Sequence, residues 1–379
     1  MATPLKDSFG PDVPRRIAAA IVGVHASFPV EAFLADALDG YDDLELTPRC
    51  RQIAASLHRH LPSDYREAIA ILMASLGPRT VDTALSGMAA FYYAPHVYFV
   101  AEFGLDDWET SMDAQYELTQ RFTAEFSIRA FLDREPERTL ARLRDWARDS
   151  SSDVRRLVSE GTRPRLPWAP RLQRFQRDPA PVVELLELLK DDPEPYVRRS
   201  VANNLNDIGK DHPELLVATC RRWLDGAGNG RRWIVRHALR SAVKRGDSAA
   251  LELLGFGAGP DVEITHVAID PGRPRIGESV RISAAMRNSG TERTRVNVDL
   301  RIHFVKANGR TGPKVFKMRE LELHVDDLAT VSKQVSLRQQ TTRTHRPGEH
   351  RVELIVNGLP HDAGSFFLQE PRTIPAGER

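Results

Sequence analysis

The sequence predicts a mostly α-helical chain that ends in a small all-β domain. Across about the first 250 residues, apolar side chains recur at three- and four-residue spacing, the period of a helix buried on one face. A glycine-rich segment, 255–260, ends this pattern. Beyond it, apolar and polar residues alternate in short runs, which is typical of half-buried β-strands.

Helical segments follow one another with only short breaks that contain Pro, Gly, Asp or Ser. Several begin after a good N-cap residue, such as Asp64 or Asp153, whose carboxylate can accept from free backbone N–H groups. The apolar spacing predicts helices over 13–24, 30–38, 49–61, 64–76, 108–132, 136–147 and 154–160.

Helical pairs also repeat along the chain. A Val-Arg pair recurs at Val154, Val197 and Val235, each time after a first helix and a polar turn. This spacing and this order of helix, turn and helix are typical of HEAT-like repeats, in which each helical hairpin buries its apolar face by stacking on the next. We therefore expect a HEAT-like α-solenoid over 1–259; a non-repetitive helical bundle is the alternative.

The segment 261–371 carries short alternating runs separated by turn residues, among them Asn308-Gly309 and Asn357-Gly358. About seven such strands in ~110 residues indicate an immunoglobulin-like β-sandwich. The usual disulfide is absent, as expected for an intracellular version. The last residues, 372–379, are expected to form a flexible tail.

The composition excludes several classes of protein. There is no run of 18 apolar residues that could span a membrane, and the N-terminus does not resemble a signal peptide. Cys50 and Cys220 lie far apart, outside any CxxC pattern, so we expect two buried free thiols in a reducing cytoplasm and no zinc or iron–sulfur site.

Charge is distributed unevenly although the net charge is only +1. Residues 1–137 carry 11 Lys and Arg against 21 Asp and Glu, whereas residues 138–245 carry 23 against 14. A basic region dominated by arginine suggests a face that binds a polyanion. Simple solvation of these arginines is the alternative.

Three acidic residues stand out within or beside this basic region: Glu125, Glu160 and Asp207. Each falls at or near the end of a predicted second helix, so they could converge on one patch. A carboxylate on a face that binds a polyanion weakens that binding, so it must serve another purpose, and attraction of a cationic target would be one. Salt bridges to neighbouring arginines are an equally good explanation.

The helical region resembles the AlkC group of bacterial DNA alkylation-repair glycosylases, HEAT-like relatives of AlkD. The resemblance rests on Leu-Pro-Ser-Asp-Tyr at 61–65, the segment around Glu125, Ser-Glu-Gly-Thr-Arg-Pro at 159–164, Leu-Pro-Trp-Ala at 166–169, the run 200–210, and Arg-Arg-Trp-Ile-Val-Arg-His at 231–237. A C-terminal immunoglobulin-like domain occurs in part of that family. One departure is Thr47, where we expect a lysine, far along the chain from the acidic residues.

The resemblance implies a monofunctional DNA glycosylase of base excision repair that releases N3-alkylated bases from double-stranded DNA. It implies that Asp207 positions water and stabilises an oxocarbenium-like sugar, with Glu125 and Glu160 as electrostatic partners. Trp168 could attract the cationic base through its aromatic face, whereas Trp233 is expected in the core. Members related to AlkD are thought to act on a base left in the stack.

Basic and amide side chains of the second helices and of one sandwich loop are expected to contact DNA: Arg155, Arg156, Arg163, Arg165, Arg198, Arg199, Asn204, Lys210, Arg232, Arg236, Arg240, Lys306, Arg310 and Lys314. We expect a monomer in the bacterial cytoplasm that needs no cofactor. The competing hypothesis is a non-enzymatic HEAT-repeat adaptor that binds DNA or protein.

Overall fold

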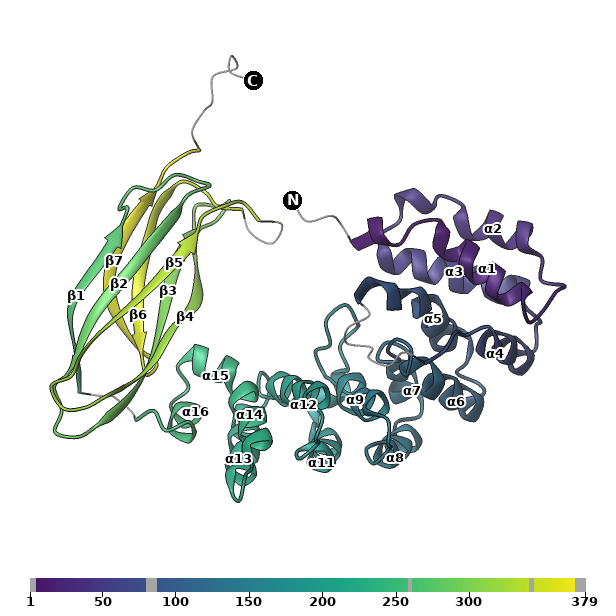
Figure 1. Cartoon of the computed structure of the whole chain (residues 1–379), viewed down its shortest axis with the longest axis horizontal. Coiled ribbons are helices and arrows are strands. Elements are labelled where there is room, and N and C mark those ends of the chain that lie inside the picture. Colours follow the sequence, from purple (N-terminus) through teal and green to yellow (C-terminus); the bar gives the residue numbers. More distant parts are fainter. Residues whose placement is uncertain (1–4, 80–86, 258–260, 341–343, 372–379) are drawn as a thin grey trace, which may run out of the picture. The chain divides into compact units, whose positions relative to one another are not determined.

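In the computed structural model the chain forms two compact units, residues 2–238 and 239–379, and each is described by itself (Figure 1). The structure describes residues 5–79, 87–257, 261–340 and 344–371. The predicted fold class, a HEAT-like helical stack followed by a small all-β sandwich, is confirmed. The domain boundary at 259 stays a prediction, and the expected tail lies outside the described residues.

Helices joined by short turns make up the first unit. Its short 3₁₀ segments are η1 (Leu5–Ser8), η2 (Tyr41–Asp43) and η3 (Gly87–Tyr93). Its α-helices are α1 (Asp12–Val22), α2 (Val30–Leu38), α3 (Leu46–His60), α4 (Tyr65–Ala74), α5 (Ala94–Phe103), α6 (Trp108–Thr119), α7 (Ile128–Arg134), α8 (Pro136–Trp146), α9 (Ser152–Gly161), α10 (Gln173–Arg177), α11 (Ala180–Leu189), α12 (Pro195–Ile208), α13 (Pro213–Leu224) and α14 (Asn229–Ala238).

Local sequence explains where several of these helices begin. Asp64 accepts a hydrogen bond from Glu67 N at 3.0 Å and so caps α4. Proline occupies the first turn of α8, α11, α12 and α13, where its missing N–H costs nothing.

The main departure from the predicted helices lies between α6 and α7. The spacing predicts one helix over 108–132, but the structure ends α6 at Thr119 and begins α7 at Ile128. Ser127 stabilises the turn, since its hydroxyl donates to the carbonyl three residues earlier at 3.1 Å and to a side chain of α6 at 2.8 Å. The turn carries Glu125, so this break decides where the carboxylate lies.

In three successive second helices, arginines near the N-terminus fasten the turn of their own repeat. Arg155 Nη1 donates to the carbonyls five and six residues earlier at 3.0 and 2.8 Å, and Arg198 Nη1 does the same at 2.6 and 2.8 Å. In α14 two arginines share this role: Arg231 Nη1 donates to the carbonyl six residues earlier at 3.3 Å, and Arg232 Nε donates to the carbonyl five residues earlier at 2.9 Å. The alignment of Val235 with the earlier Val-Arg pairs is therefore wrong, because the arginines that fasten this turn are Arg231 and Arg232.

The helices of these repeats form two rows. Figure 1 shows α9, α12 and α14 along one row and α8, α11 and α13 along the other. Helix α12 packs between α9 and α14. Side chains at equivalent positions of these second helices therefore face successive gaps between neighbouring helices.

The second unit begins with the short helices α15 (Arg240–Arg245) and α16 (Ser248–Leu253) and continues with seven strands. The strands are β1 (Val262–Asp270), β2 (Ser279–Asn288), β3 (Thr294–Val305), β4 (Thr311–Leu323), β5 (Leu328–Ser336), β6 (Gly348–Val356) and β7 (Leu359–Leu368). They form antiparallel sheets with the orders β1-β2-β5 and β4-β3-β6-β7. Alternate residues such as Val298, Leu300 and Ile302 fill the core between the sheets.

Contacts of the residues that follow α15 and α16 join these helices to β3 and to the turn between β6 and β7. Asn357 Nδ2 donates to Gly257 O at 3.0 Å, and Arg295 Nη1 donates to Leu254 O at 2.8 Å. Gly246 and Gly358 both have positive φ angles and approach so closely that a Cβ on Gly358 would lie 2.9 Å from Gly246 Cα. The two short helices and the sandwich therefore form one packed body.

Cys50 and Cys220 are free and buried, as predicted, and burial raises the pKa of each thiol to about 12. Among the described residues, no helix has the length and apolar character needed to cross a membrane.

A buried histidine makes the stability of the first unit sensitive to acid. Burial lowers the pKa of His96 on α5 to about 4, and its Nδ1 has no hydrogen-bond partner among the described residues. Because the unfolded chain binds this proton with a pKa near 6.5, stability is fully present above pH 6.5 and is lost as the pH falls toward 4. We expect a loss of about 3 kcal/mol over that interval.

Urea denaturation at a series of pH values measures this effect. The variant His96→Gln cannot take up the proton, so its stability should fall less steeply between pH 6.5 and 4 than that of the wild type. Parallel pH profiles for the two proteins would show that His96 is not the responsible group.

Candidate functional site

The three acidic residues singled out by the sequence lie on successive segments of the first unit. Glu125 is in the turn between α6 and α7, Glu160 in the last turn of α9, and Asp207 in the last turn of α12. Their side chains are 11%, 8% and 2% exposed. Burial of a charged carboxylate costs several kcal/mol, so each requires a cationic partner.

Two guanidinium groups join the carboxylates into one chain of alternating charge. Arg156 Nη1 lies 2.5 Å from Glu125 Oε2, and its Nη2 lies 3.6 Å from Glu160 Oε1. Arg163 Nη1 lies 2.6 Å from Glu160 Oε1, and its Nη2 lies 2.8 Å from Asp207 Oδ2. We call these five residues the acidic network, because three carboxylates share two guanidinium groups.

Further polar groups bond to two of the carboxylates, Glu160 and Asp207. Lys210 Nζ, on a side chain that is 40% exposed, lies 2.7 Å from Asp207 Oδ1. Ser200 donates to Glu160 Oε2 at 2.6 Å, and Ser159 donates to Ser200 Oγ at 2.7 Å. The network therefore reaches solvent most openly at Lys210.

Charge pairing outweighs burial in the middle of the network. Burial alone would raise the pKa of Glu160, but Arg156 and Arg163 hold that pKa below its ordinary value. Burial would likewise lower the pKa of Arg156, but Glu125 and Glu160 keep it above its ordinary value. Both groups are consequently charged at neutral pH.

Arg129, on α7, holds the loop that follows α9. Its Nη1 donates to Gly161 O at 3.1 Å and to Arg163 O at 2.7 Å, and its Nη2 donates to Pro170 O. Burial lowers the pKa of Arg129 to about 10, so it remains protonated at neutral pH. One side chain thus ties both ends of the segment that carries Trp168. Sequence reasoning missed Arg129 because backbone carbonyl partners leave no residue pattern.

Trp168 projects from this loop rather than packing in the core. It is 66% exposed and has a φ angle of 64°, a left-handed conformation that is rare for a bulky residue. Its ring centroid lies 6.4 Å from that of Phe91. An exposed indole in a disfavoured backbone conformation is typical of a functional position.

Trp168 is also one wall of a hollow of about 420 Å³ whose other lining residues come from the N-terminal segments: Lys6, Glu45, Leu46, Thr47 and Pro48. Lys6 Nζ and Glu45 Oε1 pair at 2.7 Å. The departure at Thr47 therefore lines the same hollow as a candidate site residue, although it is distant along the chain.

Comparisons with known proteins found a family model, a relative and a solved structure that this chain resembles. The family described as "Uncharacterised protein YhaZ, C-terminal Ig-like domain" matches residues 263–370. The protein YhaZ of Bacillus subtilis (strain 168) is 36% identical over 331 residues, which cover 87% of this chain and 89% of YhaZ. The alkylpurine DNA glycosylase AlkC of Pseudomonas fluorescens, solved bound to DNA containing an abasic site analog, superposes with a TM-score of 0.90. It is 36% identical, with 97% of this chain and 100% of that chain covered.

The chain belongs to the AlkC family. The resemblance found in the sequence is thereby confirmed.

Several basic residues of this AlkC family member bond within the protein. Arg155 fastens its own turn and also pairs with Asp192 at 2.6 Å. Arg198 fastens the turn of the next repeat through backbone carbonyls. Arg165 forms two bonds to Asp211, the longer at 2.9 Å. The sequence predicted that these arginines bind DNA. In the structure their guanidinium groups already bond to partners within the protein and hold the repeats together.

The other residues of the expected DNA-binding set differ in exposure to solvent. Arg199 on α12 and Arg232 and Arg236 on α14 are exposed, whereas Arg240 belongs to the second unit. Asn204 is fully buried, and its Nδ2 donates to a carbonyl and a hydroxyl of α9 and the residue that follows it. The exposed arginines are the members best placed to meet a polyanion.

The expected basic loop of the second unit is the hairpin between β3 and β4. Lys306, Arg310 and Lys314 are all exposed around its tip, and the Lys314 ammonium lies 5.1 Å from the ring of Phe316. The hairpin therefore presents three positive charges to solvent.

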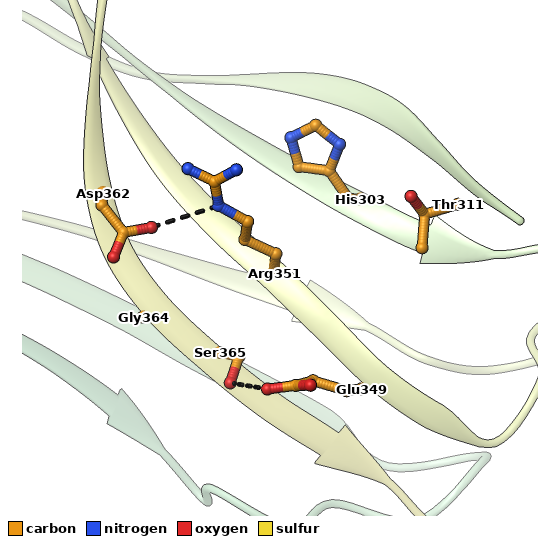
Figure 2. A pocket seen from close by; sticks show the side chains of 7 residues that line it. All are labelled: His303, Thr311, Glu349, Arg351, Asp362, Gly364 and Ser365. Atoms are coloured by element: carbon orange, nitrogen blue, oxygen red, sulfur yellow. Dashed lines mark hydrogen bonds and ion pairs between the residues drawn. The ribbon is translucent and has the colours of Figure 1, made fainter.

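A hollow of about 500 Å³ on the outer face of the four-stranded sheet was not foreseen (Figure 2). Arg351 pairs with Asp362 at 3.2 Å, and Ser365 donates to Glu349 at 2.7 Å. Because its charged groups compensate one another, it offers less to a charged ligand than the first unit does.

Proposed function

We propose that this chain is a DNA glycosylase that hydrolyses the N-glycosidic bond of cationic N3-alkylated bases, such as 3-methyladenine and 3-methylcytosine, in duplex DNA. The acidic network carries the proposal, because buried carboxylates lie on a unit whose second helices expose arginine. Similarity to AlkC, an alkylpurine DNA glycosylase bound to DNA, supports the reaction class.

The chemistry of the lesion matches such a site. Alkylation at N3 leaves a positive charge on the base and weakens its bond to the sugar. Cleavage passes through an oxocarbenium-like sugar, as in glycoside hydrolysis. A carboxylate about 4 Å from that charge contributes about 4 kcal/mol at an effective dielectric near 20, roughly a thousandfold in rate if felt only in the transition state.

We assign Asp207 to water positioning and oxocarbenium stabilisation, and Glu125 and Glu160 to electrostatic support. Asp207 is covered by Lys210, whose ammonium bonds Oδ1 at 2.7 Å and whose side chain is 40% exposed. A DNA phosphate competes for that ammonium, so duplex binding would free Oδ1 for water. Arg163 keeps the other oxygen oriented.

Base release is the direct test. The purified protein, with EDTA present, is incubated with methylated duplex DNA, and free bases are separated and quantified. We expect 3-methyladenine to appear above its spontaneous rate. Duplex binding without any release would instead favour a non-enzymatic DNA-binding adaptor. The internal pairing of all three carboxylates is the observation that supports this second candidate.

Trp168 is proposed to lie against the cationic base or sugar. We expect Trp168→Ala to slow release of 3-methyladenine about tenfold, since cation–π contacts are worth about 1–2 kcal/mol. Thermal stability should be nearly unchanged because the side chain is 66% exposed. Trp168→Phe keeps an aromatic face and should retain most activity; equal losses in both variants would point to a requirement other than the π face.

The β3–β4 hairpin is proposed as a second contact to the same DNA. Neutralising Lys306, Arg310 and Lys314 with glutamine should weaken duplex binding and make its dependence on salt shallower, by up to about 0.9 for each phosphate that the hairpin no longer neutralises. Fluorescence anisotropy at several salt concentrations measures this. As a control, Arg287→Gln changes an exposed arginine that already pairs with Glu263. An unchanged slope in the triple variant would exclude the hairpin from the interface.

We further propose a monomer that acts in the bacterial cytoplasm without a cofactor. Sedimentation equilibrium of the protein alone tests the oligomeric state.

A further inference from the structure

An aromatic pair on α14 has no role in the site described above. The rings of Trp233 and His237 stack with their centroids 4.9 Å apart and their planes 9° from parallel. Trp233 is 41% exposed, so the expectation that it belongs to the core is wrong. A ligand that covered the exposed part of this indole would gain the burial of a large apolar surface.

Repeat equivalence places this pair relative to the acidic network. The arginines that fasten their turns, Arg198 and Arg231, are 33 residues apart. The same offset relates Ser200 to Trp233, and Asn204 to His237. The aromatic pair therefore occupies, one repeat later, the positions of two side chains that border the acidic network.

The contacts agree with that placement. Ser200 and Asn204 reach back to α9, where Ser200 bonds Glu160 at 2.6 Å and Asn204 bonds Ser159 O at 2.7 Å. His237 reaches back to α12 in the same manner, with Nε2 3.3 Å from Asn203 Oδ1. Figure 1 shows α9, α12 and α14 in succession along one row, so the helix that carries the Trp233–His237 stack follows directly after the two helices that carry Glu160 and Asp207.

Charge around the stack indicates the partner. Arg199 on α12 and Arg232 and Arg236 on α14 are all exposed. On α14, Arg232 directly precedes Trp233 and Arg236 follows it by three residues, which is neighbouring spacing on a helix. A partly exposed indole between arginines of one helix suits the sugar–phosphate backbone of a nucleic acid, where arginine meets phosphate and the ring packs on deoxyribose. A protein partner would not require so dense a set of like charges.

We propose that the Trp233–His237 stack binds the backbone of the same duplex and sets its register over the acidic network. The inference rests on the proposed function, since it takes DNA as the ligand of this face. Neighbouring helix axes lie about 10 Å apart, which corresponds to about three nucleotides at 3.4 Å each. The stack is therefore a positioning element that contacts DNA a few nucleotides from the lesion.

Duplex binding and base release by the full-length protein test the proposal. We expect Trp233→Ala to weaken binding of a fluorescent duplex containing an abasic-site analogue about tenfold. The salt dependence should stay unchanged, because no phosphate contact is removed; Arg199→Gln should make it shallower by about 0.9. The control is Leu188→Ala, which removes a side chain of similar exposure, 40%, on the other row of helices. Binding by Trp233→Ala within twofold of this control would overturn the proposal.

A second measurement does not depend on how Trp233→Ala folds. DNA should quench part of the tryptophan fluorescence of the wild type, and that part should be missing in Trp233→Phe. Identical quenching in both proteins would also overturn the proposal. A protein that binds and is quenched as expected but releases no base would refute the glycosylase and leave the backbone contact standing.

Discussion

Replacing Asp207 by asparagine should slow release of 3-methyladenine about a thousandfold while leaving duplex binding intact. The substitution removes one negative charge and keeps the shape of the side chain, including an oxygen that can accept from Arg163. The rate loss follows from about 4 kcal/mol of transition-state stabilisation by a carboxylate near the developing sugar cation. Binding should be retained or slightly tighter, because a carboxylate repels phosphates in the ground state.

Single-turnover release and anisotropy separate the two effects. The matched control is Asp211→Asn, which alters a neighbouring carboxylate that pairs with Arg165 at the surface and should change the rate less than about threefold. A parallel loss of binding and release in Asp207→Asn would mean that Asp207 maintains the fold, and the assigned role in the reaction would then be abandoned.

Replacing Arg163 by methionine should destabilise the first unit by about 3–5 kcal/mol. Its guanidinium bonds Glu160 at 2.6 Å and Asp207 at 2.8 Å, and all three side chains are at most 10% exposed. Methionine has a similar length but donates no hydrogen bond, so of their charged partners Glu160 keeps only the more distant Arg156 and Asp207 keeps only Lys210. Uncompensated buried charge is among the costliest defects a fold can carry.

Urea denaturation followed by circular dichroism gives the loss in free energy of unfolding. Arg165→Met removes a less buried pair, whose side chains are both 23% exposed, and should cost less than about 1 kcal/mol. Adding Asp207→Asn to Arg163→Met should restore part of the stability, since it removes one of the stranded charges. A loss in Arg163→Met no larger than that of Arg165→Met would show that water or a rearranged partner already solvates these carboxylates.

Pattern reasoning worked where the signal is local. Apolar spacing identified many of the helices and the alternating strands, and the glycine-rich segment marked the change between them, because these periods follow from backbone geometry. It did not predict α5 (Ala94–Phe103). It failed at 108–132, where the buried residues of a turn continue the helical spacing. It also took Trp233 for a core residue, because apolar character does not reveal which side of a helix is covered.

Taken alone, the sequence determined the order of the two folds, the family resemblance, the basic character of the second helices and the identity of the three acidic residues. Only the tertiary structure decided that Arg156 and Arg163 pair these carboxylates, that Arg155 and Arg198 fasten turns, and that Trp168 is exposed and lines one hollow with Thr47. The pairs that link successive segments, Glu125–Arg156 and Arg163–Asp207, join residues 31 and 44 positions apart, and their geometry depends on how neighbouring repeats stack. No local pattern contains that information, because stacking is set by the packing of whole helices.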